Sequence, residues 1–356
     1  MRAPRLVATA VVLLALSGGR SLAQAPGVPD PAAACHATSA PLPQPALAQQ
    51  FADPFVYCAD GRFLVVASNW GGVHVPIASS ESLERWDPVR TQAGGVVDAM
   101  PELPAWVVRT PGVRPDIWAP EVARLGDRYV LYFSARHGSA KTPRGEPREC
   151  IGVATSAFPD HDFRPDPRPL VCGGFAEGVI DADVLQDGAR SLLYFKSDGN
   201  CCGLQTTLYV APLSDDGRSL AGVISPVGVS NDREWEGEIV EAPSMIRHEG
   251  RYVLFYSGGR FDSAAYGVAY AECEGPVGPC RKPEDNRILQ SGQGRDGPGH
   301  QSVFEADGRS FMAFHGLVPA TRHGADDARR LYIEPLDWSS GAPRIGMTEG
   351  APPPPR

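Results

Sequence analysis

Three carboxylates open three copies of a repeated sequence phrase. After each of Asp53, Asp181 and Glu241 comes a short apolar strand, a turn built on Asp-Gly or a near equivalent, and a second, aromatic-rich strand. If the phrases repeat around one axis, the three carboxylates point into a common central pit. Three such groups can carry out glycoside hydrolysis: one deprotonates a water, one protonates the leaving oxygen, and like-charge repulsion from the third keeps the pKa of the acid high.

The local sequence supports each carboxylate. Asp53 directly precedes Pro54, and Glu241 opens Glu241-Ala242-Pro243, so both lie near a proline at the start of a strand, where proline fixes φ and removes one N–H. Asp181 has the same offset before its strand as Asp53. Asp183 is a rival, because residues two apart on a strand point to the same face. Glu121 is interpreted as a strand residue that braces the pit, and we leave it out of the catalytic set.

The phrase occurs five times, and this repetition predicts the fold. Successive turn residues lie about 60 residues apart, at Gly61, Asp127, Gly188, Gly250 and Gly308. Such a period in an all-β chain is typical of propeller blades. A chain of 356 residues would fit two domains, but the repeat favours one. We therefore predict a single-domain, five-bladed β-propeller, with third strands beginning near Thr206 and Tyr266 and long surface loops over 72–114 and 137–148.

Composition agrees with a turn-rich globular chain. Hydrophobic residues make up 42% of the sequence, and 39 Gly and 35 Pro indicate many turns rather than long helices. The formal net charge of −9 provides no basic patch for nucleic acid, so we expect no nucleic-acid partner.

The two ends of the chain differ in character from the repeats. Residues 1–23 have a basic flank, an apolar stretch and a small-residue cleavage site, which predicts an export signal. The alternative is a membrane anchor, but the apolar run is shorter than the ~20 residues that a span needs. Residues 24–49 are rich in Pro and Ala and predict a spacer, and 346–356 predict a disordered tail, so the propeller is expected over 50–345. We predict a secreted or periplasmic protein without a transmembrane segment after signal removal.

The eight cysteines favour disulfides over free thiols, because they are even in number and the chain carries an export signal. Cys150 with Cys172, and Cys273 with Cys280, would close the most economical local loops. The pairing of Cys35, Cys58, Cys201 and Cys202 stays open. The spacing lacks the CxxC pairs and Cys/His quartets of a zinc site.

The motifs that open the phrases carry a family resemblance. In this order and at this spacing, FADP, WAPEV, IDAD, VEAP and GPGHQS resemble the motifs of glycoside hydrolase family 43, whose five-bladed propellers include arabinofuranosidases, arabinanases and xylosidases. The resemblance covers roughly residues 50–337. It implies an inverting mechanism in which Asp53 is the general base, Asp181 tunes the acid's pKa and orients the sugar, and Glu241 is the general acid. Ala182 replaces the usual proline and Ala242 the usual glycine, which affects substrate fit more than catalysis.

The resemblance also suggests binding residues. It places Trp118 in the sugar subsite, since flat aromatic faces stack on sugar C–H faces. Trp70 and Arg260 are weaker substrate-binding candidates, and Arg260 has the alternative of pairing with a loop acid. His300 is expected either to help hold a structural calcium ion or to be a hydrogen-bonded structural histidine. The chemistry itself needs no cofactor.

The sequence thus predicts a monomeric glycosidase that acts on a plant-type polysaccharide or oligosaccharide. The bond expected is an α-L-arabinofuranosyl linkage in arabinan or arabinoxylan. A β-xylosidase is the first alternative, because relatives divide between these pentosides. A propeller that only binds carbohydrate is the second, and retention of three carboxylates argues against it. A phosphorylase or sulfatase-like enzyme would need a basic cluster beside the acids, which the motifs lack.

Overall fold

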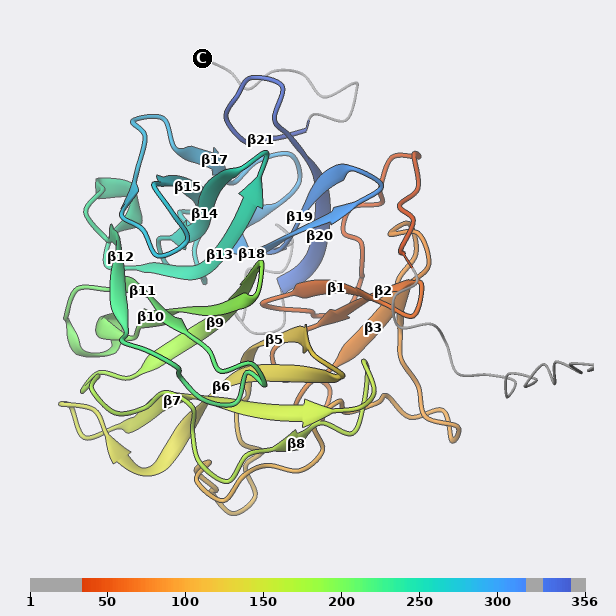
Figure 1. Cartoon of the computed structure of the whole chain (residues 1–356). Helices are drawn as coiled ribbons and strands as arrows, with labels where there is room; N and C mark the ends of the chain where they lie inside the picture. The colour runs from red at the N-terminus through yellow and green to blue at the C-terminus, as the bar shows by residue number, and fades with distance from the viewer. Residues whose placement is uncertain (1–33, 318–328, 347–356) are drawn as a thin grey trace, which may run out of the picture.

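The structure, a computed structural model, describes residues 34–317 and 329–346, which form five antiparallel sheets around a central axis (Figure 1). Within each sheet the strands pair in chain order, so every sheet is a meander that begins at the axis and proceeds outward. This is the predicted five-bladed β-propeller. The innermost strands are β1 (Phe55–Ala59), β5 (Trp118–Leu125), β9 (Val179–Asp187), β13 (Val240–His248) and β18 (Asp296–Ala306).

The remaining strands build each blade outward. The second strands are β2 (Arg62–Val66), β6 (Arg128–Lys141), β10 (Arg190–Ser197), β14 (Arg251–Gly258) and β19 (Arg309–Leu317). The third strands are β3 (Ile77–Ser80), β7 (Pro147–Ser156), β11 (Thr207–Pro212), β15 (Gly267–Cys273) and β20 (Arg329–Asp337). The outer strands are β4 (Asp87–Pro88), β8 (Arg164–Pro165), β12 (Ser225–Ser230), β16 (Cys280–Arg281) and β21 (Arg344–Ile345), with β17 (Arg287–Leu289) added beside β15. The predicted third strands near Thr206 and Tyr266 are confirmed as β11 and β15.

The innermost strands close a ring. β1 contacts β5, β5 contacts β9, β9 contacts β13, β13 contacts β18, and β18 returns to β1. Radial repetition therefore brings the starts of these five strands to one axis, although they are separated by about 60 residues in the chain.

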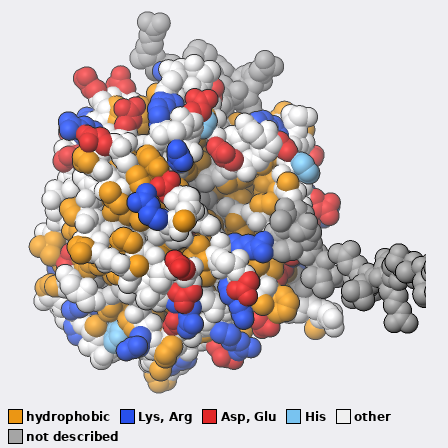
Figure 2. Space-filling model, viewed as in Figure 1, with side chains coloured by type: hydrophobic (Ala, Val, Ile, Leu, Met, Phe, Trp, Pro, Cys, Tyr) orange, Lys and Arg blue, Asp and Glu red, His pale blue; other side chains and the backbone are white. Residues whose placement is uncertain are grey.

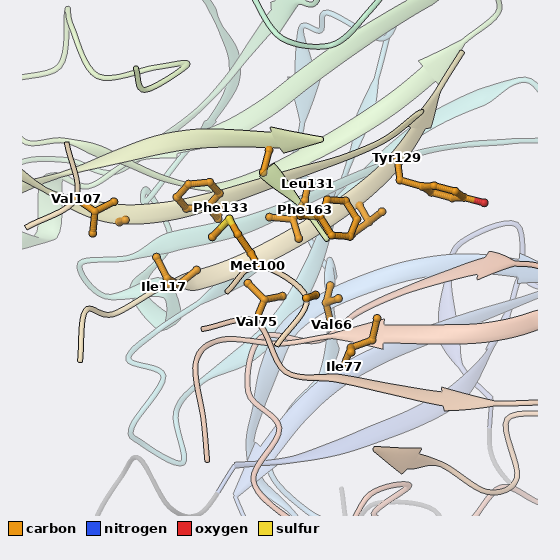
Figure 3. Close-up of a cluster of buried hydrophobic side chains, with 14 of the residues drawn as sticks. Val66, Val75, Ile77, Met100, Val107, Ile117, Tyr129, Leu131, Phe133 and Phe163 are labelled. Atoms are coloured by element: carbon orange, nitrogen blue, oxygen red, sulfur yellow. The ribbon is translucent and has the colours of Figure 1, made fainter. Parts of the chain in front are cut away.

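Apolar side chains fill the spaces between neighbouring blades. In β2, Leu64 and Val66 pack toward the second blade, whereas Phe63 and Val65 pack toward the fifth. Successive side chains of a strand point to opposite faces, so a strand buried on both faces reads as a continuous apolar run. Figure 3 shows the cluster between the first two blades, where Phe133 and Met100 lie among the aliphatic side chains.

The segment 34–49 was predicted to be a spacer, and the structure differs. Cys35 and Leu47 are buried in the cluster between the fifth and first blades. The backbone around Leu47 bonds to Leu331 of β20, and a disulfide joins Cys35 to Cys58 of β1. The N-terminal part of the described chain therefore ties the last blade to the first. The high Pro and Ala content led to the spacer prediction, but a few apolar residues of the segment are buried, and backbone hydrogen bonds and a disulfide hold them in place.

All eight cysteines are paired. The predicted bridges Cys150–Cys172 and Cys273–Cys280 are present, and the open pairings are Cys35–Cys58 and Cys201–Cys202. The described residues contain only two short 3-10 helices, Gly199–Cys202 and Glu234–Glu236, and none of their helices has the length and apolarity to cross a membrane. The predicted signal 1–23 and nearly all of the predicted tail lie outside the described residues. On the face shown in Figure 2, acidic and basic side chains are interspersed.

Candidate active site

Near the start of each innermost strand lies a non-glycine residue in the left-handed backbone region. The φ values are 56° at Asp53, 43° at Ala119, 59° at Asp181, 51° at Ala242 and 49° at His300. Residues with a Cβ rarely adopt such values, and they persist where the surrounding structure holds them. The pairing register shifts at this place in the second to fifth blades. Such a bulge bends the strand and redirects its side chains.

A cavity lies where these five residues meet. Asp53, Asp181 and His300 line it together with the residues that follow them in their strands. The lining set is Asp53, Pro54, Phe55, Ala119, Pro120, Glu121, Asp181, Ala182, Asp183, Ala242, Pro243, His300, Gln301 and Ser302. The sequence predicts that Asp53, Asp181 and Glu241 point into one central pit; Asp53 and Asp181 line this cavity, whereas Glu241 is not among its lining residues.

Asp53 is surrounded by hydrogen-bond donors and positive charge. Its Oδ2 accepts the hydroxyl of Ser68, and its Oδ1 lies 3.1 Å from Arg329 Nη1 and 3.4 Å from His300 Nδ1. Burial raises the pKa of Asp53, but Arg329, His300 and His315 outweigh burial and hold it well below its usual value. Asp53 is therefore ionised at neutral pH, as a group that accepts a proton from water must be.

The pKa of Asp181 is raised, in contrast to that of Asp53. Its Oδ2 accepts the backbone N–H of Ala242 at 2.9 Å, which places its carboxyl group beside the residue that follows Glu241. Burial raises the pKa of Asp181 to about 6, and the negative charge of Glu241 contributes, while His300 and Lys196 act against it.

Glu241 lies one position earlier in its blade than Asp53 and Asp181 do in theirs. In the fourth blade Glu241 pairs with Ser257, and in the third blade Ile180 pairs with Lys196. Ser257 and Lys196 hold the same position in their second strands, so the counterpart of Glu241 in the third blade is Ile180. The equivalent of Asp181 is Ala242. The expectation that all three carboxylates hold the same place is thus wrong by one residue. Ala242 fills the left-handed position of the fourth blade, and Glu241 precedes it. The positive φ of Ala242 also explains why a glycine suits this position.

The Glu241 carboxylate is held by two donors. Lys196 Nζ lies 2.8 Å from Oε2, and the Tyr266 hydroxyl donates to Oε1 at 2.7 Å. Burial raises the pKa of Glu241, but the charge and hydrogen bond of Lys196, the bond from Tyr266 and the charge of His300 outweigh burial and lower it. The sequence argument expected repulsion to raise the pKa of Glu241. In the structure the raised pKa belongs to Asp181, because Lys196 faces Glu241.

His300 lies among the three acids. Its charge lowers the pKa of Asp53, Asp181 and Glu241 alike. The calcium expectation is not supported: His300 Nδ1 faces the Asp53 carboxylate, and the described residues contain no group of three or more His, Cys, Asp or Glu side chains suited to a metal. Calcium takes six to eight oxygen ligands, which this surrounding does not supply.

Comparison with known proteins agrees with this geometry. The family model described as "Glycosyl hydrolases family 43" matches residues 42–343. This chain belongs to glycosyl hydrolase family 43. It is a family 43 glycosidase with a five-bladed propeller, as the motifs suggested.

Individual relatives are identical to this chain at about a quarter of the aligned positions. The chain is 26% identical over 251 residues to "Probable arabinan endo-1,5-alpha-L-arabinosidase A" of Aspergillus flavus, covering 65% of this chain and 74% of that one. It is 27% identical over 321 residues to "Xylosidase/arabinosidase 43A" of Humicola insolens, covering 79% and 89%. A solved thermostable family-43 glycoside hydrolase superposes with a TM-score of 0.68 at 27% identity, covering 86% and 96%.

Two further carboxyls of this family 43 chain lie along the same cavity. Asp183 Oδ2 accepts the N–H of Met245, and Glu121 Oε1 accepts the N–H of Val184, both from neighbouring backbone. Burial raises the pKa of Asp183 to about 7 and that of Glu121 well above its usual value. These bonds to neighbouring strands fit the bracing role expected of Glu121 and distinguish Asp183 from Asp181, whose carboxyl lies beside Glu241.

The predicted substrate-binding residues lie in different surroundings. Trp118 starts β5, with the guanidinium of Arg136 5.2 Å from the ring centroid. Trp70 is partly buried in the loop that follows β2, next to Asn69, which is bonded to Ile117. Arg260 is exposed and bonded to Asp262, the loop acid that the sequence left open as its partner.

Sequence reasoning missed four groups that contact the proposed catalytic acids. Arg329 and His315 contact Asp53, while Lys196 and Tyr266 contact Glu241. A signal was available for two of them: the second strands end in Ser68, Ser134, Lys196, Ser257 and His315 at one equivalent position, and a polar residue there interrupts each apolar run. Arg329 and Tyr266 precede or begin third strands and carry no comparable pattern.

Proposed function

We propose that this family 43 enzyme is an exported, inverting glycosidase that cleaves α-L-arabinofuranosyl linkages in arabinan or arabinoxylan. The observation that carries the proposal is that Asp53, which is held ionised, and Asp181 line one axial cavity, and that the charge of Glu241 acts on Asp181. Asp53 belongs to the first blade and Glu241 to the fourth, with the fifth blade between them. An inverting enzyme requires its two carboxyl groups to stand far enough apart for a water to fit between the base and the sugar.

In this mechanism Asp53 accepts a proton from water while the water oxygen attacks the anomeric carbon. Glu241 donates its proton to the glycosidic oxygen as the bond to the leaving group breaks. Asp181 and Glu241 repel each other when both are ionised, so the pair keeps one proton to higher pH than an isolated glutamate would. Asp181 also holds the N–H of Ala242 and thereby fixes the backbone beside the acid.

The choice of sugar rests on the relatives. The Aspergillus relative is named an arabinanase, which favours arabinofuranosyl linkages. A β-xylosidase is the second candidate, because the Humicola relative carries both activities in its name. We propose Trp118 and Trp70 as sugar-contacting residues, since aromatic faces stack on sugar rings.

The export proposal is supported by the four disulfides, which persist in oxidising compartments. Intact mass of the protein recovered from culture supernatant or periplasm tests it. A mass that lacks residues 1–23 supports export with cleavage. A full-length protein confined to the cytoplasm contradicts it.

An activity screen with a matched pair of variants tests the catalytic assignment. The purified enzyme is assayed on arabinan, arabinoxylan and the 4-nitrophenyl α-L-arabinofuranoside and β-D-xyloside. Glu241→Gln should lower kcat on the polysaccharide by about 10² or more, since general acid catalysis contributes about that much. Glu238→Gln, the same change at an exposed position three residues earlier, should leave kcat unchanged. Unchanged turnover in Glu241→Gln would refute the acid assignment.

A further inference from the structure

The left-handed residues of the five blades follow one hydrogen-bonding rule. In four of the five, the backbone N–H points to the preceding blade, where a side chain near the end of the second strand accepts it. The bonds run from Ala119 N–H to Ser68 Oγ, from Asp181 N–H to Ser134 Oγ, from His300 N–H to Ser257 Oγ, and from Asp53 N–H to His315 Nδ1. Their lengths are 2.9, 3.2, 2.8 and 3.1 Å, so four of the five N–H groups are satisfied in the same way.

The third blade breaks this rule. Its second strand places Lys196 where the others have a serine or a histidine, and an ammonium group has no acceptor. The N–H of Ala242 bonds instead to the carboxylate of Asp181, at 2.9 Å. Leaving a buried N–H unpaired would cost ~1–3 kcal/mol, so Asp181 replaces the acceptor that Lys196 cannot supply.

Lys196 turns its ammonium group to the acids. The residue is fully buried, and its Nζ lies 2.8 Å from Glu241 Oε2 and 3.7 Å from Asp198 Oδ1. A buried ammonium group needs such partners, because losing its hydration is costly. Tyr266 bonds the other oxygen of Glu241, so two donors from different strands fix the plane of this carboxyl group.

We propose that Lys196 is a positioning residue for Glu241: its ammonium group orients the carboxyl group and sets the upper pH limit of the reaction. This inference rests on the proposed function, in which Glu241 must carry a proton. A nearby positive charge favours the ionised form, which makes Glu241 a stronger acid and narrows the pH range in which it is protonated.

The groups that face Glu241 divide into two sets by the sign of their effect. Lys196 from β10, Tyr266 before β15 and His300 from β18 favour the ionised form. Asp181 from β9 and Asp198 after β10 favour the protonated form. Lys196 is the charge in direct contact, so its removal should change the proton affinity of Glu241 more than any other single change.

The test compares three variants. Lys196→Met removes the charge and keeps the length, Lys196→Arg keeps the charge, and Lys282→Met is the control. Lys282 is also a buried, ion-paired lysine, but it bonds Glu236 and Asp232 instead of the catalytic acids. In pH profiles of kcat/KM, Lys196→Met should move the alkaline limb upward by about one pH unit or more. Lys196→Arg should largely restore the wild-type limb, and Lys282→Met should leave it in place.

A direct titration separates this inference from the proposed function. The enzyme is labelled with 13C at the glutamate carboxyl groups, and the Glu241 signal is assigned by its absence from Glu241→Gln. A higher pKa of Glu241 in Lys196→Met supports the inference even if no pentoside is hydrolysed, in which case only the proposed function fails. An unchanged pKa of Glu241, or an equal change in Lys282→Met, overturns the inference. If Lys196→Met does not fold, as judged by circular dichroism, Lys196→Gln replaces it in both measurements.

Discussion

Asp181 should reduce the stability of the folded enzyme at neutral pH, and replacing it with Asn should reveal how much. Its folded pKa of about 6 lies above the reference value of 3.8, chiefly because the carboxyl group is buried. Between these two pH values the folded state holds a proton that the unfolded state releases, so stability falls as pH rises through the window. The whole loss amounts to about 3 kcal/mol, since one pKa unit is worth 1.36 kcal/mol.

Asp181→Asn removes the titrating group but keeps a carbonyl oxygen that can accept the N–H of Ala242. The free energy of unfolding, from urea denaturation, is measured for both proteins at pH 4 and pH 7.5. Relative to wild type, the variant should be more stable at pH 7.5 than at pH 4 by about 2 kcal/mol, because part of the loss has already occurred at pH 4. Activity should nevertheless fall, because a neutral amide in place of the Asp181 carboxyl group no longer affects the pKa of Glu241.

Two controls sharpen this result. Asp187→Asn should show the opposite sign, because hydrogen bonds from Tyr252 and Arg190 lower the pKa of Asp187. Asp181→Ala also removes the titrating group but leaves the N–H of Ala242 without its acceptor, so it should be less stable than Asp181→Asn by ~1–3 kcal/mol at both pH values. An Asp181→Asn difference that is the same at pH 4 and pH 7.5 would refute the reasoning.

Three further predictions address the base, the tyrosine and the N-terminal segment. Arg329→Met should raise the pKa of Asp53 and move the acidic limb of kcat/KM upward, and an unmoved limb in the pH profile would contradict the role of Arg329. Gly299→Ala should lower kcat with the fold retained by circular dichroism, because a Cβ there would overlap the ring of Tyr266, whereas Gly275→Ala, in open space, should have no effect. Cys35→Ser with Cys58→Ser opens a loop of 23 residues and should cost about 3 kcal/mol in urea denaturation, far more than Cys201→Ser with Cys202→Ser; equal losses would count against the N-terminal tie.

The fold was predictable because the hydrophobic pattern and the turn residues repeat with the same period in every blade. The two local disulfides followed from short loops. The segment 34–49 was misjudged because composition averages over many residues, whereas a few buried residues such as Cys35 and Leu47, together with hydrogen bonds, attach it to the propeller.

The site was predictable only in part. Asp53 and Asp181 hold the left-handed position of their blades, whereas Glu241 lies one residue before it. Pro243 follows Ala242 as Pro54 follows Asp53, but a proline alone does not show that the residue before it is left-handed. The partners that control charge come from other strands: Arg329 reaches Asp53 from 276 residues away. Such contacts form only when the last blade packs against the first, so the sequence around either residue does not predict them. The polar residue near the end of each second strand is visible in the sequence. The backbone N–H that most of these side chains accept belongs to the next blade, and only the structure shows that contact.

The central claim is that Asp53 and Glu241 act from opposite sides of one glycosidic bond, with a water between them. The most direct measurement follows the anomeric proton of the first product by NMR, before mutarotation, on whichever pentoside or polysaccharide the enzyme hydrolyses fastest. Our account predicts that the first sugar released has the anomeric configuration opposite to that of the substrate. Release with the same configuration would mean that a carboxylate attacks the sugar directly, and the roles assigned to Asp53 and Glu241 would be wrong.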